Sequence, residues 1–161
     1  MVPYIRPATE ADFPAIVTLI RSPEECFYVY PKAHYPWSVE QLRQLAESRQ
    51  QLSVVEHGDR LIGFANLYKV VPGDSAFIGN LIIAREARGQ GMGGRLIDYM
   101  TEQAALQYRV QEVRLSVFNE NTPALLLYTR MQFLPYALEE RVDWRGQRTG
   151  LIHMKKSIHA C

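Results

Sequence analysis

The chain has 161 residues, of which 47% are hydrophobic and 22% are charged, and its formal net charge is +1 at pH 7. This composition fits one globular domain over 1–161 and excludes a disordered or fibrous chain. A near-neutral chain lacks the basic field of nucleic-acid-binding proteins, and no apolar run approaches the roughly 20 residues of a membrane span. We therefore expect neither nucleic acid nor membrane as a partner.

Cysteine content and the first residues bear on the compartment. Cys26 and Cys161 are too few for a disulfide framework, which favours a reducing environment. The opening residues, MVPYIRPATEADFPAI, lack the charged and then apolar pattern of a signal peptide. We expect a cytoplasmic protein, and the sequence leaves monomer and homodimer equally open.

The first third of the chain combines a strand with two helices. A short strand over Tyr4 to Arg6 precedes Thr9, which with Asp12 three residues later predicts a helix start. The apolar residues of that helix, at helical spacing, are Phe13, Ile16, Val17 and Ile20. Residues 22–38 are dense in aromatics and proline and show little periodicity. Ser38 and Gln41 then form a capping box for a helix that ends near Ser48.

The remaining elements alternate hairpins with helices. Residues 51–57 and 60–71 read as strands joined at a glycine turn, and 76–84 is a third apolar strand. A glycine-rich loop opens a helix carrying Leu96, Ile97, Met100 and Ala104. Residues 112–118 form a strand, 121–131 a helix and 136–156 a closing hairpin. The order β-αα-βββ-α-β-α-ββ predicts an α/β (α+β) fold, with a mixed, mostly antiparallel sheet flanked by helices on both faces.

The glycine-rich stretch AREARGQGMGG, residues 84–94, indicates backbone lying against phosphate. Read as Gly89-x-Gly91-x-x-Gly94, it fits a dinucleotide-binding fingerprint. That fold, however, places its loop in the first βαβ unit, whereas this loop follows three hairpin-linked strands. A loop used only for tight packing is a further alternative. Read as Arg88-x-x-Gly91-x-Gly93, the stretch fits a different phosphate-binding motif.

This last pattern resembles the R/Q-x-x-G-x-G/A motif of the GNAT (Gcn5-related) N-acetyltransferase superfamily. The downstream pattern Asn121-x-x-Ala124-x-x-Leu127-Tyr128 resembles the family's second signature, N-x-x-A-x-x-L-Y. The resemblance covers nearly the whole chain and implies the GNAT fold. It also implies transfer of an acetyl group from acetyl-CoA to a primary amine, without a metal. One departure is Gln132-Phe133, where the family often has Gly-Phe.

Three shorter stretches narrow the resemblance. ECFYVYPKAHYPWSVEQL, GFANLY and LLLYT are similar to a bacterial subgroup that acetylates lysine-bearing peptides. Pro36-Trp37-Ser38 is also similar to the alanine acetyltransferases of ribosomal proteins. The acceptor is thus an amine-bearing small molecule or peptide, with a peptide lysine favoured. A CoA-binding sensor or interaction module without turnover is the alternative from another class.

The resemblance implies which residues hold the cosubstrate. The pyrophosphate would lie against the loop and the following helix N-terminus. Its pantetheine arm would pair with the strand backbone that precedes the loop. The full set of expected cofactor-binding residues is Leu81, Ile82, Ile83, Arg88, Gly89, Gln90, Gly91, Met92, Gly93, Gly94, Asn119, Asn121 and Tyr128. Arg88 reads equally well as a solvated loop arginine, and both asparagines also suit helix capping.

Tyr128 is the expected general acid for the departing thiolate. A phenol has a reference pKa about 1.5 units above that of a thiol, so it is protonated at neutral pH. The alternative is a tyrosine that fills the core.

The general base and the acceptor-binding residues are less defined. Many relatives carry a glutamate on the strand before the loop, where this chain has Asn80. The base therefore stays open among Glu24, Glu25 and His34, acting directly or through water. Expected acceptor-binding residues are Phe27, Tyr28, His34 and Asn80. The aromatic segment equally suits an apolar cover over the sheet, to which Phe27 and Trp37 would contribute.

Overall fold

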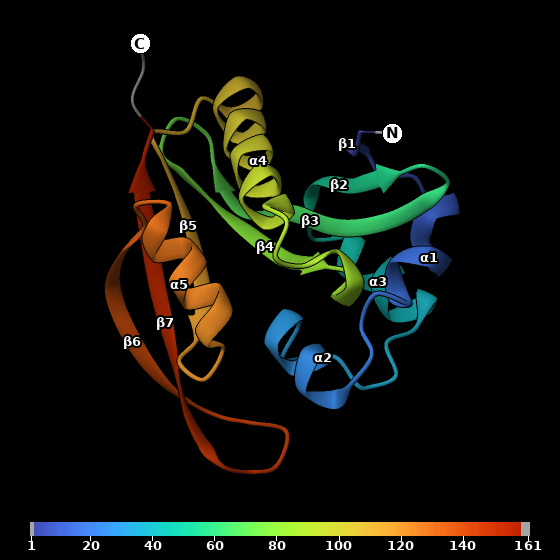
Figure 1. Cartoon of the computed structure of the whole chain (residues 1–161). Coiled ribbons are helices and arrows are strands. Elements are labelled where there is room, and N and C mark those ends of the chain that lie inside the picture. Colours follow the sequence, from blue (N-terminus) through green and yellow to red (C-terminus); the bar gives the residue numbers. More distant parts are fainter. Residues whose placement is uncertain (1, 159–161) are drawn as a thin grey trace.

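Seven strands form one mixed sheet in the computed structural model, which describes residues 2–158 (Figure 1). The order across the sheet is β1-β2-β3-β4-β5-β7-β6, and every neighbouring pair is antiparallel except β4 and β5. The strands are β1 (Tyr4–Pro7), β2 (Gln50–His57), β3 (Arg60–Val71), β4 (Ser75–Ile83), β5 (Glu112–Phe118), β6 (Leu134–Val142) and β7 (Arg148–Ser157). The predicted mixed, mostly antiparallel α+β sheet is confirmed.

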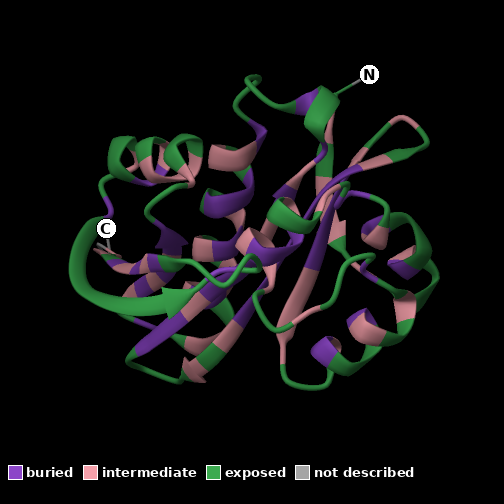
Figure 2. Cartoon of the chain, turned by 90° about the horizontal axis from the view of Figure 1, so that it is seen from below, coloured by how far each residue is buried: buried purple, intermediate pink, exposed green. Residues whose placement is uncertain are grey.

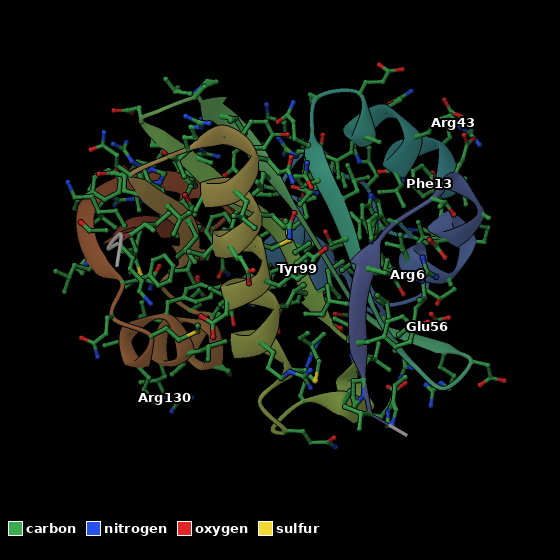
Figure 3. The ribbon with its side chains drawn as sticks, turned by 90° about the horizontal axis from the view of Figure 1, so that it is seen from above. Arg6, Phe13, Arg43, Glu56, Tyr99 and Arg130 are labelled. Atoms are coloured by element: carbon green, nitrogen blue, oxygen red, sulfur yellow. The ribbon has the colours of Figure 1, made fainter. Side chains whose placement is uncertain are left out.

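Helices cover both faces of this sheet. The α-helices are α1 (Phe13–Val17), α2 (Pro23–Val29), α3 (Val39–Ala46), α4 (Met92–Tyr108) and α5 (Thr122–Arg130), with 3-10 turns η1 (Glu10–Asp12) and η2 (Arg85–Ala87). In Figure 3, Phe13 on α1 and Arg43 on α3 lie across the sheet from Tyr99 on α4 and Arg130 on α5. None of the helices within residues 2–158 is long and apolar enough to cross a membrane.

Two details of the first third differ from the sequence prediction. The first helix ends at Val17 and not near Ile20, and it begins with the 3-10 turn. The aromatic segment, expected to be irregular, contains α2. The Ser22 side chain caps this helix by accepting a hydrogen bond from the amide of Glu25 at 3.1 Å, with Pro23 in the first turn. The helical elements before β2 are therefore three and not two.

A bidentate ion pair ties the start of the chain to the sheet. The Arg6 guanidinium on β1 donates to both carboxylate oxygens of Asp12, each at 2.9 Å. It also donates to Glu56 on β2 at 3.1 Å, and Figure 3 shows these two labelled residues side by side. The Asp12 carboxylate in turn accepts from the amide of Thr9 at 2.8 Å, the capping contact that the sequence predicted. One carboxylate therefore joins a strand and a helix start.

The main core lies between the sheet and the helices that cover it. The α4 residues predicted to be apolar and inward, Leu96, Ile97, Met100 and Ala104, are all fully buried. Phe13 and Ile16 are buried on the other face, Val17 is only half-buried, and Cys26 is buried with a free thiol. Cys161 lies outside the described residues. The edge strand β6 is instead exposed along its whole length (Figure 2).

The sheet opens between its two parallel strands. β4 and β5 are paired only over Ser75–Phe77 and Glu112–Arg114, so the rest of each strand has no partner on that side. Asn80 lies on the unpaired part of β4 with a left-handed φ of 53°, where the pairing with β3 shifts register. Such a bulge bends a strand. The diverging strands leave room between them for the candidate site.

Candidate active site

A cleft of about 1480 Å³ occupies the opening between β4 and β5. Small-molecule pockets usually measure about 300–1,000 Å³, so this cleft has room for a long ligand and a second reactant. The lining comes from the unpaired parts of β4 and β5, the glycine-rich loop, α2, α5, β6 and β7. In Figure 1, α2 and α5 lie on opposite sides of the opening below the diverging strands.

The glycine-rich loop presents free backbone amides to this cleft. Gly89 and Gly91 adopt left-handed φ values of 77° and 82°, which glycine accepts without steric cost. Gly91 is the N-cap of the 17-residue helix α4, and the first backbone hydrogen bond runs from Arg95 to the Gly91 carbonyl. The preceding amides of the first turn therefore have no helical partner. Such a helix start with a positive dipole end suits phosphate oxygens.

Not every loop residue that the sequence predicted to bind the cofactor lies in the cleft. Gly89, Gly91, Met92, Gly93 and Gly94 line the cleft, whereas Gln90 is exposed outside the lining.

Arg88 also lines the cleft, but its guanidinium folds back toward the protein. It donates to the Ile83 carbonyl at 3.0 Å and to Glu25 at 3.4 Å. In this position Arg88 joins the end of β4 to α2, and it is neither a fully solvated loop residue nor free.

The unpaired edge of β4 brings the three predicted strand residues, Leu81, Ile82 and Ile83, to the cleft. Because β5 diverges from β4 beyond Phe77, the backbone polar groups of these three residues on the β5 side have no strand partner. An extended ligand with amide groups can complete such an edge as an added strand. The glycine-rich loop follows directly at the end of the same strand.

Asn80 has a different environment from the one predicted. Its side-chain oxygen accepts from Asn66 at 2.8 Å and from Arg49 at 3.2 Å, and its amide nitrogen donates to the Val29 carbonyl at 2.8 Å. Asn80 thus lines the cleft, but its polar atoms hold β3, β4 and the end of α2 together.

Tyr128 projects from α5 into the same cleft and is 93% buried. Burial raises the pKa of its phenol well above the usual value, so the hydroxyl stays protonated. α5 starts with Pro123 in its first turn and Asn121 at the N-cap position, although no side-chain hydrogen bond caps it. Asn121 lines the cleft, which leaves its side chain available to a ligand.

Asn119 does not share that position. Its side-chain oxygen accepts from the Gly150 amide at 2.7 Å and from the Thr149 hydroxyl at 3.1 Å, and it lies outside the cleft lining. These contacts join the end of β5 to β7. The Asn119 side chain therefore holds two strands together, whereas the Asn121 side chain is open to the cleft.

The residues considered as the base are separated in the structure. Glu24 and Glu25 both line the cleft, but the Glu25 carboxylate is held by Arg85 at 2.7 Å and by Arg88. His34 is exposed and outside the lining, where its backbone amide donates to Gln41 at 2.8 Å.

The aromatic acceptor residues are likewise divided. Tyr28 lines the cleft, while Phe27 lies behind it, buried 4.4 Å from the ring of Phe118. Trp37 is buried in the core, so part of the aromatic segment does cover the sheet.

Sequence reasoning missed a hydrogen-bonded chain across β5, β7 and β6. The Ser116 hydroxyl on β5 lies 2.7 Å from Nδ1 of His153 on β7, and Nε2 of His153 lies 2.7 Å from the Glu139 carboxylate on β6. All three residues line the cleft. Arg141 donates to Glu139 at 2.9 Å, and this bond, with that of His153, lowers the pKa of Glu139 to about 2. No motif announces these residues, because strand register alone brings them together.

Within residues 2–158, no group of three or more His, Cys, Asp and Glu side chains is arranged to hold a metal ion. The polar groups that line the cleft are backbone amides, hydroxyls, side-chain amides, carboxylates, basic side chains and one imidazole. These groups suit an organic ligand with phosphates and amides.

Several solved structures that are similar to this chain bear the names of acetyltransferases. Spermidine N-acetyltransferase from Vibrio cholerae, in complex with CoA and spermine, has a TM-score of 0.80 and 22% identity, covering 96% of this chain and 95% of that one. A ribosomal-protein-alanine N-acetyltransferase from Brucella melitensis has a TM-score of 0.75 and 21% identity, covering 96% and 99%. The structure of yncA from Salmonella typhimurium with its cofactor acetyl-CoA has a TM-score of 0.73 and 16% identity, covering 100% and 98%.

The sequence profile of the acetyltransferase (GNAT) family matches residues 16–133. The chain therefore belongs to the GNAT family and is an acetyl-CoA-dependent N-acetyltransferase. This match decides the reading of the glycine-rich loop in favour of the acetyltransferase motif. The unpartnered amides at the start of α4 and the open edge of β4 fit the phosphates and amide groups of acetyl-CoA.

Proposed function

We propose that this enzyme acetylates a primary amine by direct transfer, with Tyr128 as the general acid and a peptide lysine as the acceptor. The observation that carries the proposal is the convergence of three features on one cleft: the open edge of β4, the glycine-rich loop and the buried Tyr128 phenol. Each feature supplies one requirement of acyl transfer to an amine. Bound acetyl-CoA would supply the activated acetyl group.

The glycine-rich loop and the start of α4 bind the diphosphate in this proposal. The amides following Gly91 donate to phosphate oxygens, and the helix dipole favours the negative charge. The backbone of Leu81 to Ile83 holds the amide-bearing arm along the β4 edge, and Asn121 lies free beside it. In the proposal, one of these strand amides polarises the thioester carbonyl.

Tyr128 donates a hydrogen bond, and then a proton, to the departing sulfur. Its burial disfavours the phenolate, and the same environment disfavours a free thiolate. The pKa values of the phenol and the thiol are therefore both raised, and proton transfer between the two groups stays feasible. Water is largely excluded at this point because the phenol is enclosed on α5.

The cleft lining supports an acceptor that combines a charged end with an apolar stem. Tyr28, Tyr68, Phe77 and Phe118 line the cleft and offer aromatic surface to methylene groups. The carboxylates of Glu24 and Glu120 can pair with an ammonium group, and Lys32, Arg49 and Lys69 line the same cleft. A lysine side chain combines these two properties.

The acceptor is tested by following thiol release from acetyl-CoA with a panel of amines. The panel contains spermine, an alanine-terminated peptide and a lysine-bearing peptide, and mass spectrometry locates the added acetyl group. We expect the highest kcat/KM with the lysine peptide and the acetyl group on its side chain. A preference for spermine or for the alanine terminus would overturn the assignment of the acceptor. Stabilisation by acetyl-CoA without thiol release for any amine would identify a binding module instead.

A further inference from the structure

The three residues Ser116, His153 and Glu139 form a continuous chain of hydrogen bonds that ends in the cleft. Both links measure 2.7 Å, which is short for contacts of this type. The residues come from three adjacent strands, β5, β7 and β6, and none was recognisable from sequence. Ser116 and His153 face each other directly in the β5–β7 register, so the first link is fixed by the sheet itself.

We propose that this chain is the proton relay that deprotonates the acceptor amine, which rests on the acetyl transfer proposed above. Ser116 receives the proton, His153 is the base, and Glu139 orients the imidazole and stabilises its charged form. The relay and Tyr128 line the same cleft, so the proposed base and acid open onto one common space.

The acceptors on the chain fix the direction of proton flow. Glu139 stays ionised at neutral pH, because Arg141 and His153 hold its pKa near 2. An ionised carboxylate only accepts hydrogen bonds, so Nε2 of His153 carries the hydrogen of that link. Nδ1 of the neutral ring is then an acceptor, and the Ser116 hydroxyl donates to it. The Tyr68 phenol is a second hydrogen-bond partner of Ser116. One lone pair of the Ser116 oxygen is then left for an ammonium group in the cleft.

The proton transfer balances in two coupled steps. One N–H bond of the acceptor ammonium breaks and its proton joins the Ser116 oxygen, while the original hydroxyl proton moves to Nδ1 of His153. The resulting imidazolium is paired with Glu139 and later returns its extra proton to solvent. The neutral amine attacks the thioester, and a second amine proton replaces the one that Tyr128 gives to the thiolate. The net products are the amide, the free thiol and one proton.

Several charged or titratable groups lie around the His153 side chain and its partners. They are Glu139, Tyr136 and Arg141 on β6, Arg114 on β5, Lys155 on β7 and Tyr68 on β3. Imidazole is the side chain that changes charge nearest to neutral pH, which suits a base that must recycle in every turnover.

The residues proposed earlier as the base lack these features. Glu25 is occupied by two guanidinium groups, and His34 is outside the cleft lining. Glu24 lines the cleft as a single carboxylate. Of these candidates, the Ser116 chain combines an acceptor atom in the cleft with a fixed path leading away from it.

The test compares His153→Gln with the matched variant His57→Gln, which lies on the β2–β3 hairpin outside the cleft lining. At pH 7, with the best amine of the panel, we expect His153→Gln to lower kcat at least 100-fold, as loss of a general base usually does. Its kcat should keep rising toward pH 9.5 as the amine deprotonates in solution, whereas wild type levels off. His57→Gln should behave like wild type. Retained kcat in His153→Gln would overturn the relay.

Glu139→Gln is paired with Glu140→Gln, its exposed neighbour on β6. We expect only the first to lower kcat, by about tenfold, while acetyl-CoA binding measured by thermal shift stays unchanged in both. Imidazole ¹⁵N spectra give a readout without turnover: His153 should be protonated at Nε2, and Glu139→Gln should mix the two tautomers. A ring protonated at Nδ1 would contradict the relay. If wild type acetylates no amine, the transfer proposal fails separately, because the tautomer measurement needs no substrate.

Discussion

Gly93 on α4 lies directly against Leu127 on α5, because a Cβ atom at Gly93 would come within 3.0 Å of the Leu127 side chain. Helix α4 and the helix that carries Tyr128 are therefore in contact at a point where a larger residue would be crowded. Tyr128 follows Leu127 in the chain, so the position of the proposed acid depends on this contact.

Replacing Gly93 with valine should separate the two helices. We expect the free energy of unfolding to fall by about 1–3 kcal/mol, as overpacked sites usually show. Gly94→Ala is the matched control, since a Cβ atom there would meet Met131 at an ordinary 3.6 Å. That variant should be as stable as wild type or more so, because alanine favours helix. Urea denaturation measures both, and equal stability of the two variants would contradict the packing argument.

Gly91→Ala should weaken the binding of acetyl-CoA. The residue has a φ of 82° at the N-cap of α4, where a side chain is strained and the neighbouring amides face the cleft. We expect the KM for acetyl-CoA to rise about tenfold, equivalent to about 1.4 kcal/mol of binding free energy. Gly73→Ala is the control, because it shares the left-handed backbone (φ 80°) in the β3–β4 turn outside the cleft lining. Both variants should lose similar stability, and an unchanged KM for Gly91→Ala would argue against the phosphate site.

Gln132→Gly should stabilise the protein. Gln132 has a left-handed φ of 74° and ends α5 in a Schellman motif, with bonds from its amide to Thr129 and from the Phe133 amide to Tyr128. A residue with a side chain pays about 1–2 kcal/mol for this conformation, so glycine should raise the free energy of unfolding by about 1 kcal/mol. Thr129→Gly, inside the helix, should lower it by a similar amount. Destabilisation by Gln132→Gly would show that its side chain has another role.

The Arg6–Asp12 pair should make stability depend on pH in the acid range. The two hydrogen bonds from Arg6 lower the pKa of Asp12 to about 2, below the unfolded value of about 3.9. The stabilisation is therefore complete above about pH 4 and is lost as the pH falls toward 2. Asp12→Asn should cost about 1–3 kcal/mol at pH 7 and much less at pH 2.

Glu10→Gln provides the comparison for that variant. Its ion pair with Arg43 is exposed, so its removal should cost under about 1 kcal/mol. Urea denaturation at the two pH values measures both variants. A cost of Asp12→Asn that does not change with pH would contradict the assignment of the pair.

Much of the fold could be predicted because its signals are local. Strand periodicity, glycine turns and helix caps gave all seven strands, and fixed spacing placed Gly91 and Tyr128 on their elements. Ser22 and Pro23 are typical of a helix start, but the sequence did not predict α2. The aromatic residues of this segment hide the helical spacing of its apolar positions. The departure at Gln132 was visible in the sequence, but its left-handed backbone was not.

The site was only partly predictable, since side-chain partners depend on tertiary structure. Asn80 and Asn119 were expected to bind ligands, but their polar atoms have partners on neighbouring strands. His153 lies 37 residues from Ser116, and only the β5–β7 register brings them within hydrogen-bond distance. A spacing motif cannot encode such a contact, because it depends on the length of every turn between the two strands.

The central claim, acetyl transfer with Tyr128 as general acid, is tested most directly by the kcat of Tyr128→Phe. The measurement is thiol release from acetyl-CoA with the best amine of the panel, alongside Tyr99→Phe on α4, outside the cleft lining, as the matched control. We predict that Tyr128→Phe lowers kcat at least 100-fold and changes the KM for acetyl-CoA less than about twofold, while Tyr99→Phe retains full activity. An unchanged kcat in Tyr128→Phe would contradict the proposed mechanism.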